Sequence, residues 1–363
     1  MTTSSTASGV VADSQRVFMS VKNGRTDIVV QIGVPATTAD YGVLIPVPGE
    51  PELDDEPVDE NDLIALDLAT APKIVTVTES QASDSSGSGC GCGALEANSV
   101  KGGDGNGPPG RGSENGVTTT EPVNIGPVSA VVLTGTDGDA VNAWLADNGF
   151  VIPEADQPTV EGYVGSDRYF IAIRRSEAAV SGSPSSIGIH YSLPGDHRML
   201  SLGFARIGAA SSVAFTLFLS APSTVGVSAP FETISLDDLD PALLRADEYR
   251  TAVANAVFTR DSRAFVLESA HAASALTPQL SAKFQALPAP SAVITRLSTV
   301  INADALDEDA IFATPYTDAV RDERYVSLPR VSPVYAGFGV AVVLVLGGAL
   351  RRRQRGSAAR KRC

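Results

Sequence analysis

Hydrophobic residues recur at every second position in two runs near the start of the chain, residues 17–21 and residues 28–32. A period of two is typical of β-strands that bury one face. Between the runs stands Asn23-Gly24, a pair that supplies the two positive-φ residues of a tight turn. The pattern therefore predicts a β-hairpin over residues 16–34.

Further short segments rich in β-branched and aromatic residues predict additional strands. They are residues 41–48, 73–79, 123–133, 169–174, 187–192, 199–207, 213–220, 264–269 and 292–300. In the first of these segments, Pro46 and Pro48 lack the N–H that a sheet ladder needs. We therefore expect this strand to end at an edge or rim of its sheet.

Four other segments have the signals of helices. Residues 59–72 carry acidic side chains in the first turn, and residues 138–150 place Gly149 where a helix C-terminus favours glycine. Asp240 and Pro241 predict the start of a third helix with a core-facing stripe. The stripe consists of Tyr249, Ala252, Val253, Ala256 and Val257. Residues 278–287 predict a fourth helix.

Residues 80–121 interrupt this pattern. They consist mainly of Gly, Ser, Asn and Asp, with almost no side chain to bury. Such a segment cannot offset the entropy lost on ordering, so we predict a disordered Gly/Ser-rich loop within one domain over residues 10–326. Antiparallel strands with a few inserted helices predict an α+β fold with a mostly antiparallel sheet.

The C-terminal end has a different character. Residues 334–350 contain no charged or strongly polar side chain. As a helix they would extend about 26 Å, close to the bilayer's hydrocarbon core of about 30 Å. A buried core helix is the alternative, but seven basic residues directly follow, and basic residues stay on the cytoplasmic side of a span. We therefore predict a transmembrane helix over residues 331–350 and a basic cytoplasmic tail over residues 351–363.

An extracytoplasmic domain needs an export signal. The start MTTSSTASGVVADSQRVFM has neither the basic nor the apolar region of a signal peptide. Either the signal lies upstream of this start, or the C-terminal helix inserts as a tail anchor. Tail anchoring would leave the domain in the cytoplasm and contradict the position of the arginines. We therefore predict a missing signal peptide and a single-pass protein of the cell membrane, with its N-terminal domain extracytoplasmic.

The charge of the chain limits its partners. Residues 1–350 contain all 42 acidic residues and only 20 of the 27 basic ones. Such a surface repels DNA, RNA and anionic lipid, so we expect no nucleic-acid partner. Hydrophobic residues make up 43% of the sequence, which suffices for one large domain or two ordinary ones.

The order of several segments resembles the bacterial DUF2330 family. The segments are DYGVLIPVPGEPEL, LDLATAPKIVTV, CGCG, VNAWLADNGFVIP, RYFIAIR, AFVLESA and VITRLSTVINADALDEDAIF, spread over about residues 10–316. The resemblance implies an exported, often membrane-anchored bacterial protein without an assigned activity, and it adds no catalytic residues. Members of that family usually have a signal peptide followed by a Cys-Gly-Gly stretch, whereas Ser8-Gly9-Val10 stands near that position here.

Cys90 and Cys92 form the most suggestive chemical motif, Cys-Gly-Cys-Gly. Two thiols this close can form a strained, easily reduced disulfide or hold a soft metal ion. Two cysteines are only half of a closed zinc site, however, and no other cysteine precedes the apolar run. A local loop-closing disulfide or an inert pair is the alternative.

His190 and His197 are weaker metal candidates. Together with Asp196 they could bind one metal ion across a tight turn. Alternatively, residues 187–192 and 198–205 are paired strands joined by a Pro-Gly turn, with ordinary histidines on them. The chain contains only 3 histidines, which favours this second interpretation.

The sequence contains no nucleophile elbow, metalloprotease helix, P-loop or dinucleotide-binding glycine pattern. It therefore favours a membrane-anchored domain that binds or scaffolds a protein or glycan in the cell envelope over an enzyme, and it identifies no cofactor. The alternative is a thiol redox or metal-handling protein that acts through Cys90 and Cys92.

Overall fold

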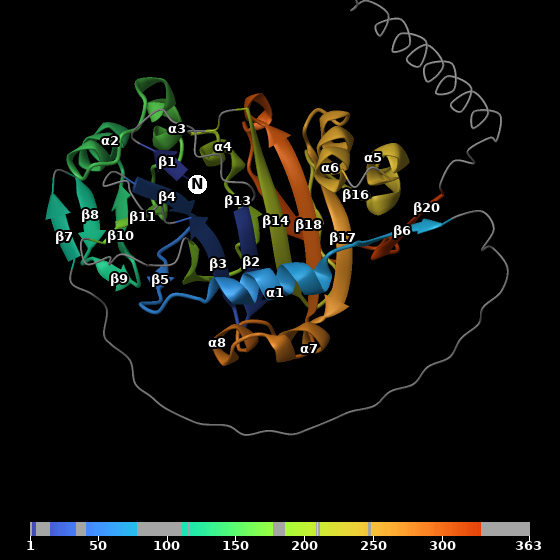
Figure 1. Cartoon of the computed structure of the whole chain (residues 1–363). Coiled ribbons are helices and arrows are strands. Elements are labelled where there is room, and N and C mark those ends of the chain that lie inside the picture. Colours follow the sequence, from blue (N-terminus) through green and yellow to red (C-terminus); the bar gives the residue numbers. More distant parts are fainter. Residues whose placement is uncertain are drawn as a thin grey trace, which may run out of the picture. The chain divides into compact units, whose positions relative to one another are not determined.

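Two large β-sheets contain most of the described strands of the protein (Figure 1). The computed structural model describes residues 2–4, 15–33, 41–77, 111–114, 116–176, 186–207, 209, 211–245 and 248–327. The chain divides into a unit of Met1–Val75 with Cys90–Arg324 and a unit of Thr76–Gly89 with Tyr325–Cys363. Both large sheets belong to the first unit. The described residues of the second are the ends of two paired strands, β6 (Lys73–Val77) and β20 (Glu323–Ser327).

The eight-stranded sheet takes strands from both halves of the chain, in the order β16-β17-β18-β14-β2-β3-β12-β5. They are β2 (Gln15–Lys22), β3 (Arg25–Gly33), β5 (Glu52–Leu53), β12 (Ser186–Pro194), β14 (Ser212–Ala221), β16 (Glu232–Ser235), β17 (Ala264–Ala272) and β18 (Val293–Asn302). Neighbours are antiparallel except for two parallel pairs, β2 with β14 and β16 with β17. The predicted hairpin is confirmed, since Asn23 and Gly24 join β2 to β3 with φ angles of 54° and 75°.

The seven-stranded sheet is antiparallel, along the path β1-β4-β11-β10-β8-β7 with β9 also paired to β10. Its strands are β1 (Thr2–Ser4), β4 (Tyr41–Val47), β7 (Arg111–Glu114), β8 (Val117–Thr120), β9 (Val123–Ile125), β10 (Val128–Gly135) and β11 (Tyr169–Arg175). Pro46 lies beyond the part of β4 that pairs with β1, at a rim as predicted. A small third sheet joins β13 (Met199–Leu200), β19 (Ala310–Ala313) and β15 (Gly226–Val227).

Side chains of the eight-stranded sheet alternate between two cores. On one face, Met19 belongs to a large core that also contains Ile45 of the seven-stranded sheet. On the other face, Phe18 packs against Phe284 with ring centroids 4.8 Å apart and shares a smaller core with Leu63. This second core lies under α1 (Glu60–Thr70), α7 (Ala273–Leu276) and α8 (Ala282–Gln285), and Figure 1 shows α1 crossing the strands.

Two helices have the ends that the sequence predicts. The Asp59 side chain accepts a hydrogen bond from the backbone N–H of Asn61 and caps α1. α2 (Gly138–Asp147) is followed by Gly149 with a φ of 81°. The predicted stripe on α6 (Tyr249–Phe258) is also confirmed, because four of its five residues are buried. The remaining α-helices are α3 (Gln157–Glu161), α4 (Leu202–Ala205) and α5 (Pro241–Arg245), and 3-10 turns occupy Glu154–Asp156, Leu236–Asp238, Thr277–Gln279 and Ala303–Ala305.

The α+β fold with mostly antiparallel sheets is confirmed, but residues 199–207 are not one strand. They form β13 and the short helix α4, where Leu202, Phe204 and Ala205 are all buried. Burial on several sides suits a helical turn better than a half-exposed strand. β13 pairs with β19, while β12 pairs with β3 and β5, so the hairpin predicted between residues 187–192 and 198–205 is wrong.

The helix predicted from Pro241 is also divided in two. α5 ends at Arg245, and the backbone N–H of Glu248 donates to the carbonyl oxygen of Leu243 at 2.9 Å. This bond spans five residues, one more than an α-helix uses, so the ladder is interrupted before α6 begins.

The segment predicted to be disordered contains regular structure at its C-terminal end. Residues 111–114 and 117–120 are β7 and β8, and Val117 is 1% exposed. The β-branched run Val-Thr-Thr-Thr suits a strand, so the prediction is wrong for these residues. Residues 80–110, which include Cys90 and Cys92, lie outside the described residues.

The predicted transmembrane helix, residues 331–350, and the basic tail, residues 351–363, also lie outside the described residues. Within the described part of the chain, no helix is both long enough and hydrophobic enough to cross a membrane.

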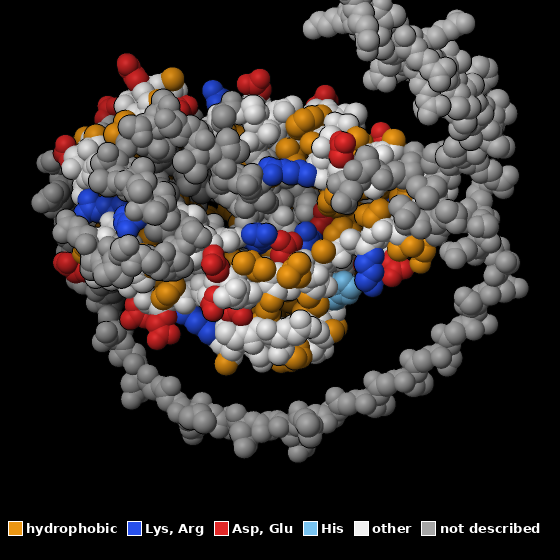
Figure 2. All heavy atoms as spheres, viewed as in Figure 1, with side chains coloured by type: hydrophobic (Ala, Val, Ile, Leu, Met, Phe, Trp, Pro, Cys, Tyr) orange, Lys and Arg blue, Asp and Glu red, His pale blue; other side chains and the backbone are white. Residues whose placement is uncertain are grey.

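On the face shown in Figure 2, few charged side chains lie over α7 and α8, in keeping with the single charged residue, Lys283, among residues 272–292.

Candidate functional site

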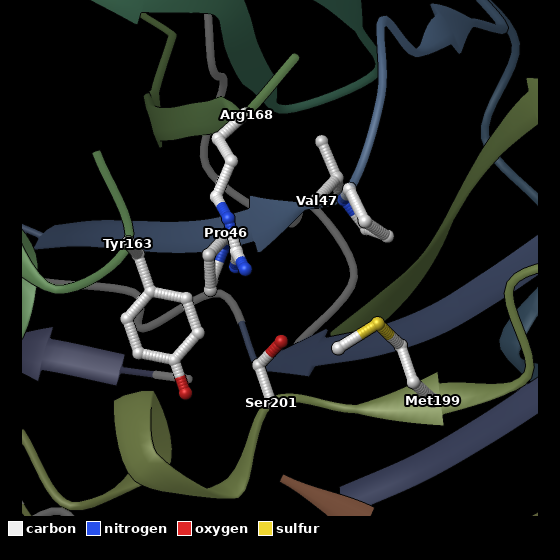
Figure 3. A pocket seen from close by; sticks show the side chains of 7 residues that line it. Pro46, Val47, Tyr163, Arg168, Met199 and Ser201 are labelled. Atoms are coloured by element: carbon white, nitrogen blue, oxygen red, sulfur yellow. The ribbon is translucent and has the colours of Figure 1, made fainter. Parts of the chain in front are cut away.

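A pocket lies where the rim of β4 meets the segment before β11 and the residues after β13 (Figure 3). Its lining residues are Pro46, Val47, Pro48, Tyr163, Arg168, Met199 and Ser201. Figure 3 shows Arg168 and Ser201 projecting into the pocket from opposite sides, with Tyr163 on one flank and Met199 on the other. The pocket therefore combines two hydrogen-bond donors with apolar walls.

Asp309 holds Tyr163 in place. The Tyr163 hydroxyl donates to Oδ1 of Asp309, and the same oxygen accepts from the backbone N–H of Gly203 at 3.2 Å. Burial and this carboxylate raise the pKa of Tyr163 well above its ordinary value. A Cβ on Gly203 would lie 2.8 Å from the Tyr163 hydroxyl oxygen, so this close approach requires glycine.

Ser201 occupies the N-cap position of α4 without capping it. A serine at this position ordinarily accepts a hydrogen bond from the second or third backbone N–H of the helix. Here the N–H of Gly203 donates to Asp309 instead, and the Ser201 side chain makes no capping bond. Ser201 is 8% exposed. A largely buried hydroxyl is therefore left to face the pocket (Figure 3).

Arg168 differs from most arginines in the described part of the chain. Its side chain is exposed, its guanidinium carbon lies 6.0 Å from the ring centre of Tyr163, and it forms no ion pair with a described carboxylate. Ion pairs are the rule elsewhere in this acidic protein. They join Arg16 to Asp67, Arg25 to Glu52, Arg198 to Asp196, Arg260 to Glu232, Arg263 to Asp307, Arg296 to Glu268, and both Arg321 and Arg324 to Asp237.

The pocket is narrow. About 180 Å³ there is free of protein atoms, open solvent included, but none of this space admits the centre of a water-sized molecule. An adjoining space shares Pro46, Met199 and Ser201, continues between the sheets past Met19 and Tyr191, and leaves about 40 Å³ for water-sized centres. Since a drug-sized ligand fills roughly 300 Å³ or more, neither space holds a whole ligand, and only the adjoining space has room for one small chemical group.

A second polar cluster is buried between α1 and the eight-stranded sheet. Glu268 is 0% exposed and accepts from Nε of Arg296 and from the Tyr249 hydroxyl, the latter at 2.6 Å. Glu268 is the extra residue of a β-bulge between Leu267 and Ser269. The bulge supplies a buried carboxylate within an otherwise apolar strand.

Asp67 completes the cluster from α1. Its Oδ1 lies 2.6 Å from NH1 of Arg296, and its Oδ2 lies 2.7 Å from NH2 of Arg16. Burial alone would lower the pKa of Arg296, but the charges of Glu268 and Asp67 raise it, so the guanidinium remains charged. Burial and the charge of Glu268 raise the pKa of Tyr249. The charged groups of this cluster, two arginines and two carboxylates, therefore pair with one another.

His190 lies between two carboxylates and apart from this cluster. Nδ1 is 3.2 Å from Oδ2 of Asp54, and Nε2 is 3.3 Å from Oδ1 of Asp27. Lys283 also contacts Asp54, with Nζ 2.9 Å from Oδ2. Burial alone would raise the pKa of Asp54, but hydrogen bonds from Lys283, the Glu56 backbone and His190 lower it overall. His190, predicted as a metal candidate, is thus held in a partly buried hydrogen-bond cluster.

His197 has different partners. Its Nε2 lies 2.8 Å from the carbonyl oxygen of Pro194, and its backbone N–H donates to Thr26. Asp196 pairs with Arg198, which lowers the pKa of Asp196. The structure thus gives His190, His197 and Asp196 separate partners. Among the residues that the structure describes, no group of three or more His, Cys, Asp or Glu could hold a metal ion.

Sequence reasoning missed Arg168, Ser201 and Asp309, because they converge from segments distant in the chain and none belongs to a recognisable motif. It also missed the buried ion pair of Glu268 and Arg296, which the sequence does indicate. Glu268 and Arg296 each interrupt a strand that is otherwise largely apolar, in AFVLES and AVITRLSTV. Charged residues are almost never fully buried unless they are paired, so two such interruptions indicate a buried ion pair.

A protein-family model matches the N-terminal part of the chain. The DUF2330 family model, described as an uncharacterized protein conserved in bacteria, matches residues 2–211, more than half of the 363 residues. The chain belongs to the DUF2330 family. The match includes the described strands of the seven-stranded sheet together with Arg168 and Ser201 of the pocket. It ends before β14, so the DUF2330 match is shorter than the resemblance over residues 10–316 indicated.

No curated protein matches this DUF2330 chain. One solved structure is similar at low level, that of a mutated baculovirus P35 after caspase cleavage. The two chains are 8% identical, the similarity covers 61% of this chain and 74% of that one, and the TM-score is 0.27. A score this low establishes no common fold.

Proposed function

We propose that the protein is an extracytoplasmic binding domain, anchored in the cell membrane by residues 331–350, with a protein or glycan partner in the cell envelope. One observation carries the proposal: the uncharged run of residues 334–350 directly precedes seven basic residues. Because basic residues that flank a span stay in the cytoplasm, the domain over residues 10–326 lies on the opposite side.

The acidic composition of this domain supports a partner other than nucleic acid or anionic lipid. The small size of the spaces beside Pro46 supports binding of a partner at the surface of the domain, since no sizeable ligand fits inside. Binding therefore takes place at the surface of the domain.

Single-cysteine variants of the full chain test the orientation. The double variant Cys92→Ser, Cys363→Ser retains Cys90, and the matched variant Cys90→Ser, Cys92→Ser retains Cys363. A membrane-impermeant maleimide should label Cys90 on cells whose outer layers are opened, and Cys363 only after the membrane is permeabilised. Labelling of Cys363 in sealed cells, with protection of Cys90, would overturn the proposed orientation.

The Cys-Gly-Cys-Gly sequence supports a second candidate, a thiol redox or metal-handling function through Cys90 and Cys92. Thiol titration with and without reductant, together with metal analysis, tests it on the purified full chain. Bound metal that is lost in Cys90→Ser, Cys92→Ser, or a reversible disulfide between the two thiols, would support this function. Two free thiols without metal would exclude it.

A further inference from the structure

We propose that the outer side of α1, together with α7 and α8, lies against the lipid surface of the membrane in which the chain is anchored. This inference rests on the proposed function, because it takes the span over residues 331–350 as the anchor. The exposed residues of these helices form what we call the uncharged face. They are Leu68 and Ala69 of α1, Ser274 and Ala275 of α7, and Ala282 and Gln285 of α8.

α1 is apolar on the side that faces away from the sheet as well as on the side that packs against it. Leu66 is 1% exposed and belongs to the smaller core, whereas Leu68 on the outer side is 75% exposed. The only charged residue among residues 63–71 is Asp67, which is paired with two arginines. A helix that is hydrophobic all round is ordinarily buried on all sides. The composition of α1 therefore indicates that a further surface covers its outer side.

α7 and α8 continue this uncharged surface. They cover the same face of the eight-stranded sheet as α1, because Leu276, Phe284 and Leu66 belong to one core. Residues 272–292 contain one charged side chain, that of Lys283, and it lies in an ion pair. Figure 2 shows hydrophobic side chains among uncharged ones over α1, α7 and α8. An exposed apolar patch on an otherwise charged protein marks a site of contact with a protein or a membrane.

The position of the anchor favours the membrane over a protein partner. Six residues, 325–330, separate Arg324 from the predicted span, so Arg324 lies within about 25 Å of the membrane. Close to it, the carbonyl oxygen of Asp322 accepts from the backbone N–H of Lys73 at 2.9 Å. Lys73 begins β6, the strand that directly follows α1. The chain thus leaves the domain beside the end of α1 that exposes Leu68.

The charges around the uncharged face specify the kind of lipid. Asp59 and Glu60 lie at the N-terminal end of α1, and Glu56 precedes them. These carboxylates repel anionic headgroups over a Debye length of about 8 Å at physiological ionic strength. Contact therefore depends on burial of apolar side chains at the level of zwitterionic headgroups, and a larger fraction of anionic lipid weakens it.

Lipid quenching of a fluorophore tests the contact on the full chain in nanodiscs. In a chain with Cys90, Cys92 and Cys363 replaced by serine, Ser274→Cys carries the label on α7. Nanodiscs of phosphatidylcholine that contain spin-labelled lipid should quench most of its fluorescence. Val151→Cys is the matched control, because Val151 is an exposed hydrophobic residue outside the uncharged face. A label at this position should keep most of its fluorescence.

A charged substitution connects the quenching to apolar burial. Leu68→Asp should lower the ratio of lipid-bound to free domain by roughly tenfold or more, because moving a leucine out of an apolar environment shifts an equilibrium by about this factor. Val151→Asp adds the same charge at another exposed hydrophobic residue and should leave the quenching unchanged. Replacing part of the phosphatidylcholine by phosphatidylglycerol should reduce the quenching at low salt. Thermal melting of each variant verifies that the fold is retained.

Three results would overturn the proposal: no quenching at Ser274→Cys, equal quenching at Ser274→Cys and Val151→Cys, or unchanged quenching in Leu68→Asp. Efficient disulfide cross-linking of two chains at Ser274→Cys in detergent would also overturn it, since a second copy would then cover the face. A chain that fails to enter nanodiscs would overturn the proposed anchor and this inference with it. An inserted chain that shows no quenching would overturn this inference alone.

Discussion

Arg296 reaches from β18 to the last turn of α1, where its NH1 group donates to the carbonyl oxygen of Asp67 at 2.6 Å. The last carbonyl groups of a helix have no partner within the helix and carry the negative end of its dipole. A buried guanidinium therefore satisfies the end of α1 and neutralises Glu268 at the same time. α1 is attached to the sheet by charge as well as by its apolar face.

Replacing Arg296 with Met should strongly destabilise the fold. It leaves Glu268, which is 0% exposed, without its cation, and the expected loss is about 3–5 kcal/mol of unfolding free energy. Urea denaturation of the full chain in detergent, followed by circular dichroism, measures the loss. Arg321→Met is the control, because the Arg321 side chain is 72% exposed and should cost at most about 1 kcal/mol. Equal effects of the two substitutions would contradict a buried ionic contact.

The Tyr163 hydroxyl should make stability depend on alkaline pH. Its pKa is raised in the fold, first by burial and then by Asp309, so the unfolded chain releases this proton at lower pH than the folded chain does. The stabilising contribution is therefore fully present below about pH 10, the pKa of an unfolded tyrosine, and is lost as pH rises above it. The difference in melting temperature between wild type and Tyr163→Phe should be constant up to about pH 9 and should shrink between about pH 10 and pH 11. A difference that grows between these pH values would contradict the assignment.

Residues 85–110, which lie outside the described residues, should tolerate removal. The adjacent residues 111–120, which include β7 and β8, should not. Replacing residues 85–110 by a short Gly/Ser linker should change the melting temperature only slightly, because these residues are mostly Gly, Ser, Asn and Asp. Extending the replacement to residue 120 removes β7, β8 and the buried Val117, and should unfold the protein at moderate temperature. Thermal circular dichroism distinguishes the two; an equally large loss from both would show that residues 85–110 are packed.

The folded part should be one cooperative unit. β2 and β3 lie in the middle of the eight-stranded sheet, between β14 and β12 from later in the chain. A fragment of residues 10–80 therefore lacks both flanking strands and should be unfolded by circular dichroism, and residues 122–326 should be unstable alone. A sharp melting transition from either fragment by itself would instead indicate two domains.

Local features of the fold were predictable because they depend on neighbours in sequence. Asn23-Gly24 fixes a turn through the φ angles of two adjacent residues, and Asp59 and Gly149 act on the helices next to them. The pairing of the strands was harder to predict from the sequence. Nothing near Met199 indicates that β13 pairs with β19, more than 100 residues later, rather than with β12.

The candidate pocket depends on long-range packing in the same way. Ser201 makes no capping bond because Asp309 caps α4 in its place, through a hydrogen bond from Gly203, 106 positions away from Asp309. Likewise, Glu268 is brought to Arg296 by a bulge that a period of two does not anticipate. Residue type alone therefore identified histidines and cysteines as candidates and passed over an ordinary serine and an ordinary arginine.

The parallel pairing of β2 with β14 has a consequence for the synthesis of the chain. β2 leaves the ribosome well before the neighbour on one of its edges, which is Ser212–Ala221. Until that segment emerges, the edge of β2 has unpaired backbone groups and the sheet cannot close. In this state the exposed edge of β2 can pair with another chain, so the nascent protein is prone to aggregation. The topology thus delays folding until most of the domain has been made.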